Sequence, residues 1–427
     1  MSHICTAVPP YLLQAIADSD KNSPSCRQAA LAALTHSETF TDARASRLAH
    51  LTQPAALRAL HPSPPPQAIV PEQLLRQISE SDSVDPETRA RAARDAEHIR
   101  DVAAAREAAA LTTTTPSLQV EDTTTPSLAK PKTQKAGFFR AVFDAQNDFD
   151  QAALPGEQVR LEGQPPASDQ AANEAYDNVG QVLKFYLDKF GWRSLDGRNM
   201  PVVSSVHFGD MYGNAFWSSD RMQMVFGDGN EFLFNFTGCI DVIGHEMTHA
   251  VTEHTSPLVY RNQSGALNEH ISDVFGIMVK QMVENETADE ADWLIGEGCL
   301  LPGVRGVALR SMKNPGSAYN DPRFGKDPQP AHFSEFEPIS EDRGGVHRYS
   351  GIPNKAFHLA AVAFGGFSWE KAGQIWWKTM TGGTVPPLCT FIQFADATVD
   401  VAAEEFGATA AKIVRAAWDQ VGVTREH

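Results

Sequence analysis

The sequence predicts an α+β chain of two lobes, a β-rich N-terminal lobe and a mainly α-helical C-terminal lobe. Between residues 138 and 236, short apolar runs alternate with Gly and Asp turns, as at 200–208, which is the pattern of strands and hairpins. Residues 171–190, by contrast, have helical apolar spacing. After Thr237 the spacing is mostly helical. A junction between two such lobes predicts a cleft, a common place for a substrate site.

We place the boundary between the lobes after residue 254, which gives an N-terminal lobe of 136–254 and a C-terminal lobe of 255–427. The helix that carries His245 and His249 falls at this junction. Three further helices are predicted from periodicity: one around Glu269, one over 354–363 and one over 402–421.

The N-terminal part of the chain has a different composition. Residues 1–81 show short helical patterns broken by Pro and Ser, and residues 85–111 are rich in Ala, Arg, Asp and Glu, as in a solvated helix. The stretch that follows contains TTTPSL twice, at 113–118 and 123–128, a composition that predicts an exposed linker. We therefore assign 61–135 to an added helix and a Thr/Pro linker.

Charge and hydropathy exclude several classes of partner. The chain has 36 basic and 53 acidic residues and a formal net charge of −17. It lacks a basic cluster with interleaved aromatics, so no nucleic-acid partner is expected. Its apolar stretches are too short to span a membrane, so no membrane partner is expected either. We expect a monomer.

The cysteines and the N-terminus predict a location. Residues 1–20 lack a basic segment followed by an apolar one, so they do not read as a secretory signal. The five cysteines lack CxxC spacing, which favours reduced thiols: Cys5, Cys26, Cys239, Cys299 and Cys389. These observations predict a cytoplasmic protein, or one exported by a non-classical route.

The motif that indicates chemistry is the run 245–249, His-Glu-Met-Thr-His, followed by Glu269. Two histidines four apart on a helix face the same way, so both rings can hold one ion. A carboxylate from a second helix completes the two-His, one-carboxylate set of a catalytic zinc site. Glu246 lies beside His245, where a general base for a zinc-activated water is needed. The sequence therefore predicts a zinc metallopeptidase with His245, His249 and Glu269 as metal ligands.

Neighbouring residues favour a metal site over the alternative, an amphipathic helix with histidines on a polar face. The largely apolar run 240–244 predicts a buried helix, where unpaired histidines would be costly. Asp273 lies four residues after Glu269 on the same helix face and can accept the remaining ring N–H of a ligand histidine. We expect Asn268, like Asp273, to lie behind the metal ligands and support them. His270 should point away from the metal.

Further motifs follow in order along the chain: Asn214-Ala215-Phe216-Trp217, 227–229, 264–269, 309–312, 344–347 and 419–423. Together with the histidine motif they resemble the thermolysin-like family of neutral metallopeptidases from about residue 138 to the C-terminus. The run 9–13, Pro-Pro-Tyr-Leu-Leu, resembles the start of the short propeptides of the protealysin-like branch. We therefore assign residues 1–60 to a propeptide.

The resemblance implies catalytic roles for four residues. Glu246 would act as general base and then carry the proton to the leaving amine. His347 and Tyr260 would donate hydrogen bonds to the oxyanion that forms at the scissile carbonyl. Asp342 would orient His347 and favour its protonated form.

The resemblance also implies how substrate binds. Asn214 and the backbone of Ala215 would pair with the substrate main chain as an added strand does. Arg310 would bind a substrate carbonyl, and Val242 and Leu309 would line an apolar pocket on the primed side. The implied function is a zinc endopeptidase made as a zymogen, with its propeptide as intramolecular inhibitor. It would cleave proteins or peptides on the amino side of bulky hydrophobic residues.

One departure from the family concerns calcium. Secreted relatives hold a double calcium site near the second ligand helix. Acids remain at three of its positions, Asp241, Asp292 and Glu297. Three others, where acids are expected, hold Lys280, Leu294 and Gly298. Calcium needs several oxygen ligands, so we predict that the double calcium site is absent and that Lys280 could neutralise the remaining acids.

Other interpretations stay open. An exopeptidase with the same metal chemistry would need an acidic anchor for a free amino terminus, and none is evident. A zinc-stabilised binding protein with little turnover would be expected to lack Glu246 or His347, and both are present. Cys5, close to Pro9, could contact the zinc in the zymogen, although a bland residue at a frayed terminus is the simpler interpretation.

Overall fold

The computed structural model describes residues 8–35 and 137–424, apart from the short segments 219–220, 230–232, 257, 323–324 and 341. The chain divides into two compact units, and every described residue belongs to the unit of Ser2–Ser37 and Lys132–His427. The predicted helix at 85–111, the TTTPSL linker and Cys5 lie outside the described residues.

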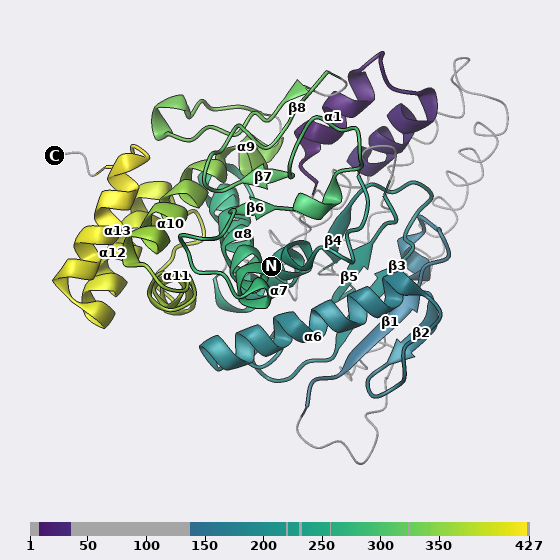
Figure 1. The fold of residues 1–427 in the computed structure, drawn as a ribbon, viewed down its shortest axis with the longest axis horizontal. Coiled ribbons are helices and arrows are strands. Elements are labelled where there is room, and N and C mark those ends of the chain that lie inside the picture. Colours follow the sequence, from purple (N-terminus) through teal and green to yellow (C-terminus); the bar gives the residue numbers. More distant parts are fainter. Residues whose placement is uncertain are drawn as a thin grey trace, which may run out of the picture. The chain divides into compact units, whose positions relative to one another are not determined.

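The N-terminal lobe is built on a five-stranded mixed sheet of order β2-β1-β3-β5-β4 (Figure 1). Its strands are β1 (Arg140–Asp144), β2 (Glu157–Leu161), β3 (Val202–Val206), β4 (Ala215–Ser218) and β5 (Gln223–Phe226). Strand β3 runs parallel to β1 and β5, whereas β2 and β4 pair antiparallel at the two edges. Every residue of β4 and β5 is buried, so this side of the sheet is covered on both faces.

Helix α6 (Gln170–Phe190) packs along the sheet against β1, β2 and β3 (Figure 1). The Asp169 side chain caps its start by accepting a hydrogen bond from the Ala172 N–H, and Gly191 ends it in the left-handed conformation, with φ of 66°. Its buried apolar side chains recur at helical spacing, as the sequence of 171–190 predicted.

Two long helices form the centre of the molecule, α7 (Ile240–Thr255) and α8 (Asn262–Glu284). They approach closely because glycines lie at the crossing. A Cβ on Gly276 would lie 2.6 Å from the Asp241 carbonyl oxygen, and a Cβ on Gly244 would lie 3.0 Å from the Gly276 Cα. Any larger residue at Gly276 would force the two backbones apart. The glycines therefore fix the separation of the two helices that carry the predicted ligands.

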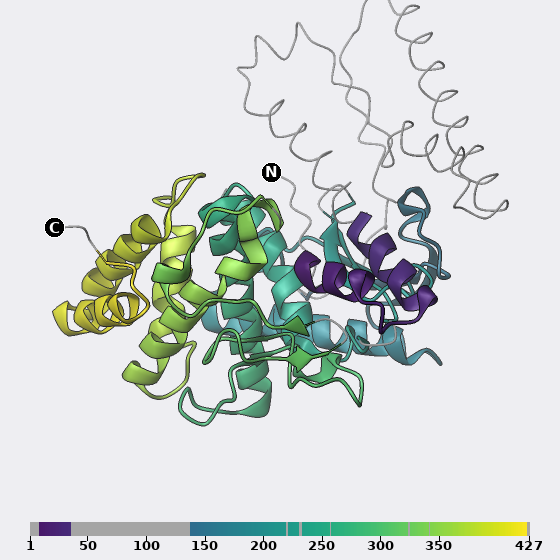
Figure 2. The same cartoon turned by 90° about the horizontal axis from the view of Figure 1, so that it is seen from above.

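The C-terminal lobe is mainly helical, as predicted, and its last four helices lie away from the sheet (Figure 2). Its helices after α8 are α9 (Asp342–Tyr349), α10 (Gly351–Phe364), α11 (Lys371–Thr381), α12 (Phe391–Phe406) and α13 (Ala408–Gln420). The short strands are β6 (Leu294–Ile295), β7 (Arg310–Ser311), β8 (Asn320–Asp321) and β9 (Gly325–Lys326). Short 3₁₀ turns are η1 (Gln151–Ala153), η2 (Glu297–Cys299) and η3 (Phe333–Glu335).

The predicted helix at 354–363 lies within α10, but the single helix predicted over 402–421 is wrong. The structure has two helices there, α12 and α13, joined at Gly407. Gly407 has φ of 82°, in the left-handed region that an α-helix cannot include. The apolar periodicity on either side of the glycine concealed the break.

The N-terminal segment forms helix α1 (Pro10–Asp18) and a second helical stretch at 24–35. Pro10 starts α1, where its missing N–H is not needed. Leu12, Leu13 and Ile16 are buried, and α1 contacts α9. This segment therefore packs on the part of the C-terminal lobe that carries His347.

Candidate metal centre

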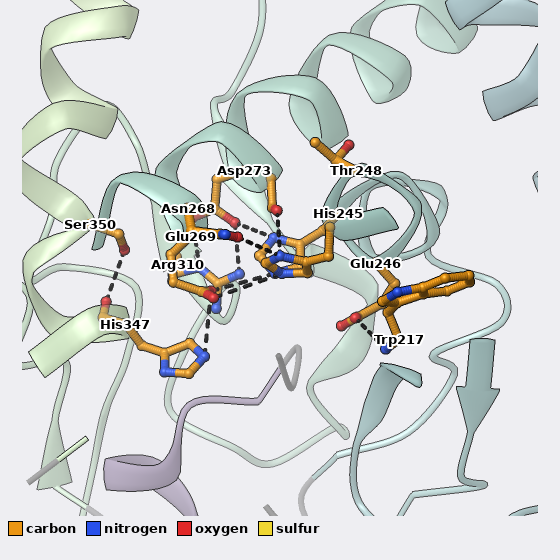
Figure 3. A network of polar contacts seen from close by, with 12 residues as sticks. Trp217, His245, Glu246, Thr248, Asn268, Glu269, Asp273, Arg310, His347 and Ser350 are labelled. Carbon is orange, nitrogen blue, oxygen red and sulfur yellow. Dashed lines mark hydrogen bonds and ion pairs between the residues drawn. The ribbon is translucent and has the colours of Figure 1, made fainter. Parts of the chain in front are cut away.

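The three predicted ligands, His245, His249 and Glu269, converge on one point between α7 and α8. Figure 3 shows His245 and Glu269 facing each other there. The Nε2 atoms of His245 and His249 lie 3.0 Å apart. The carboxylate of Glu269 lies 3.5 Å from His245 Nε2 and 3.7 Å from His249 Nε2. Ligand atoms on one tetrahedral zinc ion are about 3.3 Å apart. All three side chains are buried, at 1% exposure or less, so the spacing and the donors fit a single zinc ion.

The far side of each imidazole is held by a polar partner. His245 Nδ1 lies 2.9 Å from Asp273 Oδ1. His249 Nδ1 lies 2.8 Å from Asn268 Oδ1 and 3.1 Å from Ser272 Oγ. Because the Nδ1 atoms carry the N–H to these acceptors, the Nε2 lone pairs face the common point. Asp273 and Asn268 thus lie where the sequence predicted, behind the ligands.

A buried oxygen supports the fit of a cation. Glu269 Oε2 makes no well-formed hydrogen bond with the described residues, and its nearest partners are His347 Nε2 at 3.4 Å and His245 Nε2 at 3.5 Å. A buried carboxylate oxygen held only by such long contacts is costly. Burial alone would raise the pKa of Glu269, but the charge of His347 and the contact with His245 hold that pKa well below its usual range. The carboxylate is therefore ionised and able to ligate.

Asp273 is bound by more than His245. Arg310 donates to it from Nε (2.9 Å) and from Nη2 (2.7 Å), and Asn354 donates from Nδ2 to Oδ2 at 2.8 Å. Burial alone would raise the pKa of Asp273, but the charge of Arg310 and the contact with His245 hold it well below the usual range. The Arg310 guanidinium, which is 1% exposed, lies against Asp273. Its binding of substrate stays a prediction.

His270 points away from the ligands, as expected, and takes part in a chain of hydrogen bonds that the sequence did not reveal. Trp376 Nε1 donates to His270 Nε2 at 2.7 Å, so His270 Nδ1 carries the proton toward Asn354 Oδ1 at 2.8 Å. Burial lowers the pKa of His270 to about 4. A neutral His270 therefore links Trp376 to Asn354, and through it to Asp273. The sequence showed only that His270 follows Glu269 directly, and this position alone did not reveal Trp376 or Asn354 as its hydrogen-bond partners.

Glu246 is fully buried on the same helix as the two histidines (Figure 3). Its Oε2 accepts from the Trp217 backbone N–H at 2.9 Å, whereas Oε1 has no hydrogen-bond partner among the described residues. Burial raises the pKa of Glu246 to about 8. The backbone of β4 thus fixes Glu246 Oε2, and Oε1 is left able to accept a proton.

His347, Tyr260 and Asp342 meet on the other side of Glu269. His347 Nδ1 lies 2.7 Å from Asp342 Oδ1, and its Nε2 lies 3.3 Å from the Tyr260 hydroxyl. The Tyr260 hydroxyl in turn donates to Glu269 Oε1. Burial alone would lower the pKa of His347, but Glu269 and Asp342 raise it above its ordinary value. The three side chains lie together as the resemblance implied.

The predicted substrate-binding residues lie in two places. Asn214 Oδ1 accepts from the Ala215 N–H at 2.9 Å and also from the Val8 N–H at 2.8 Å, while Asn214 Nδ2 donates to the Val8 carbonyl at 3.3 Å. The N-terminal segment therefore occupies both polar groups of Asn214. Val242 and Leu309 are both fully buried, so neither presents an open surface here.

Lys280 lies among the acids that remain at the positions of the family's calcium site. Its Nζ is 2.9 Å from Asp292 Oδ2 and 3.0 Å from Glu297 Oε2. It also donates to the Leu294 carbonyl at 3.3 Å. Asp241 Oδ2, close by, accepts from the Gly296 N–H at 2.6 Å. The ammonium thus neutralises these acids directly, as the sequence suggested.

The chain matches two family models, described as the thermolysin metallopeptidase catalytic domain, over residues 106–253, and the thermolysin metallopeptidase α-helical domain, over residues 256–423. An "Extracellular metalloprotease" of Pectobacterium carotovorum is 50% identical over 285 residues, which cover 66% of this chain and 81% of that protein. "Protease PrtS" of a Photorhabdus species is 47% identical over 287 residues, which cover 66% of this chain and 76% of that protein.

A solved structure of the precursor of protealysin, a metalloproteinase from Serratia proteamaculans, is 43% identical to this chain. It has a TM-score of 0.66 and aligns over 83% of this chain and 99% of the solved one. With the convergent His, His and Glu side chains, these matches define a metallopeptidase of the thermolysin family, to which this chain belongs. Within the family it is a metalloendopeptidase of the protealysin-like branch.

One expectation from the sequence is wrong. We expected a cytoplasmic protein or one exported by a non-classical route, and the cytoplasmic location is contradicted because the relative at 50% identity is named as extracellular. The expectation depended on the absence of a classical signal pattern in residues 1–20 and on scattered cysteines, and neither observation tests for export by another route. Among the described residues, no helix is both long and apolar enough to span a membrane.

Proposed function

We propose that this protein is a zinc-dependent, extracellular endopeptidase made as a zymogen. The observation that carries the proposal is the convergence of His245, His249 and Glu269 beside a Glu246 carboxylate with one unpartnered oxygen. A binding protein would not need a buried carboxylate held ready by the backbone of β4. The family is zinc-dependent, and the three donors are the set that catalytic zinc takes.

Zinc bound by these three side chains would supply a Lewis acid that lowers the pKa of water and polarises the scissile carbonyl. Glu246 then accepts the proton of the attacking water at Oε1 while Trp217 N–H holds Oε2 in place. The same carboxyl group delivers that proton to the departing amine. One residue thus serves as base and then as acid.

The oxyanion is stabilised by two donors on the side opposite Glu246. His347 is kept protonated by Asp342, so its Nε2–H can donate, and the Tyr260 hydroxyl lies 3.3 Å from that atom. When substrate arrives, the hydroxyl exchanges its bond to Glu269 for one to the developing negative charge. Each donor therefore contributes more in the transition state than in the ground state.

Substrate lies along β4 in an extended conformation. The two hydrogen bonds between Asn214 and the backbone of Val8 are those that a substrate residue would make. We infer that the N-terminal segment is a propeptide that blocks the cleft in the manner of a peptide. The solved relative is itself a precursor. Val242 and Leu309 would line an apolar pocket for the substrate residue on the primed side. Such a pocket would give a preference for bulky hydrophobic side chains there.

The decisive experiment uses an internally quenched, end-blocked peptide with Phe on the primed side, and a matched peptide with Asp there. Wild type, Glu246→Gln and a surface control, Glu284→Gln, are compared with and without a zinc chelator, with N-terminal processing followed by mass. We expect cleavage before Phe by wild type and control only, abolished by the chelator. A mature, zinc-loaded wild type that cleaves neither peptide would refute the proposal and favour a binding protein.

A further inference from the structure

Two cysteines distant in sequence meet beside the metal helix. Cys239 is the residue immediately before α7, and Cys299 is the last residue of η2. Their sulfur atoms lie 3.1 Å apart, although 60 positions separate them in the chain. Cys239 is 7% exposed and Cys299 is fully buried. A contact this close needs a sulfur–sulfur approach of only about 1 Å more to reach disulfide bonding distance.

The segment around Cys299 is held to the rest of the lobe by backbone hydrogen bonds and one ion pair. The Cys299 carbonyl accepts from the Phe234 N–H at 3.1 Å. Glu297, in the same short turn, is bound to Lys280 through a half-exposed carboxylate. Gly296 donates its N–H to Asp241 on α7. The Lys280 ammonium is buried, but the Glu297 carboxylate is half-exposed, and an ion pair that water and salt can reach stabilises only weakly. A covalent bond from this turn to the start of α7 would also hold η2 against the helix, and unlike the ion pair it would not be weakened by salt.

We propose that Cys239 and Cys299 form a disulfide bond in the mature protein, a cross-link that fixes η2 to the residue immediately before the metal helix. The oxidant is a low-molecular-weight disulfide. One cysteine thiolate attacks it, releasing one small thiol and leaving a mixed disulfide, and the second cysteine thiolate then displaces the other small thiol. Two protein thiols are oxidised, one small disulfide is reduced to two thiols, and the two cysteine protons leave with them.

Burial determines when this can happen. In the folded chain the Cys299 thiol is inaccessible, and contact with Cys239 together with burial raises its pKa well above the ordinary value. Since the thiolate is the attacking species, exchange takes place while this region folds or opens. Once formed, the bond is shielded from reductants by the same packing. The inference is independent of peptidase activity. Both thiols are free in the structure, and the proposal concerns their oxidation as the protein matures.

The test uses full-length Glu246→Ala protein, so that self-cleavage does not intervene, refolded with and without oxidised glutathione. After unfolding, free thiols are alkylated and counted by mass, and unreduced digests are searched for the linked peptides. We expect the oxidised sample to alkylate at two thiols fewer than the five in the sequence, with one cross-link joining Cys239 to Cys299. Five alkylated thiols, or a link through any other cysteine, would overturn the proposal.

A second measurement tests whether the bond stabilises the protein, and its main comparison uses the wild-type sequence, so it does not depend on whether a cysteine variant folds. The Tm of protein refolded with oxidised glutathione is compared with the Tm of protein refolded in a phosphine, a reductant that does not compete for zinc as dithiols do. We expect reduction to lower Tm by roughly 4–10 °C. Cys389→Ser should keep this difference and Cys299→Ser should lose it. Equal Tm values for oxidised and reduced wild type would show that the bond does not stabilise the turn.

Discussion

Asn354 donates from Nδ2 to Asp273 Oδ2 at 2.8 Å, which joins α10 to the carboxylate that supports His245. The other end of the same amide accepts from His270. Asn354 therefore connects a ligand-supporting acid to a core histidine, and both are fully buried. A ligand geometry supported in this way depends on a residue that never contacts the metal.

Replacing Asn354 by Ala should weaken zinc binding while the three ligands stay in place. The substitution leaves Asp273 and His270 each without one buried partner, which costs about 1–3 kcal/mol of folding stability. Loss of such a supporting contact typically lowers metal affinity or activity by about 10–100-fold. Zinc affinity by competition with a chromophoric chelator measures this directly, with the exposed Asn320→Ala as control. Unchanged affinity would show that Arg310 alone suffices to fix Asp273.

Replacing Asp342 by Asn should lower kcat much more than it changes KM. The amide can still accept from the His347 N–H, but it removes the negative charge that favours protonated His347. Since the oxyanion exists only on the reaction path, the lost interaction belongs to the transition state. Steady-state kinetics on the quenched peptide would decide. A rise in KM at constant kcat would assign Asp342 to substrate binding.

His207 gives a pH dependence of stability far from the metal. It lies 2.7 Å from Asp228 and 2.9 Å from Asp169, and the bond to Asp228 raises its pKa to about 9 against the opposing effect of burial. The folded-state pKa exceeds the unfolded value of about 6.5, so the contribution is complete below about pH 6.5 and is lost as pH rises through about 9. His207→Asn should therefore cost more stability at about pH 6 than at about pH 9.5. Urea unfolding at both pH values measures this, and an equal loss would contradict it.

Lys280 should make the wild type insensitive to calcium. Its ammonium lies among the acids that would otherwise bind the ion, and those contacts raise the pKa of Lys280 despite its burial. Micromolar calcium should leave the Tm of wild type unchanged and raise that of Lys280→Glu, which restores an acid. Lys280→Met, which only removes the charge, should melt below wild type with or without calcium. A marked rise for wild type would disprove the predicted absence of the double site.

The sequence was informative where function depends on local spacing. His245, His249 and Asp273 could be placed because residues four apart on a helix share a face, and Glu269 because its helix follows directly. The same reasoning could not detect the contact of Cys239 with Cys299, or of Asn354 with Asp273, because 60 and 81 positions separate the partners. Such contacts depend on how helices pack, which in α7 and α8 is set by glycines whose importance is visible only at the crossing.

The first four residues within the bounds of α9, Asp342 to Gly345, are left-handed and not helical, with φ between 47° and 88°, so the regular helix begins only next to His347. A Cβ at Gly344 would meet Asn262 Oδ1 at 2.0 Å, and one at Gly345 would meet the Tyr349 ring at 2.5 Å. Because a side chain at either glycine would collide there, in a backbone conformation that other residues rarely adopt, one change would strain the turn that leads to His347 without touching any group that takes part in the chemistry. A related sequence that keeps every catalytic residue but lacks one of these glycines would encode a protein with a misplaced His347. A comparison based only on the catalytic residues would still classify it as active.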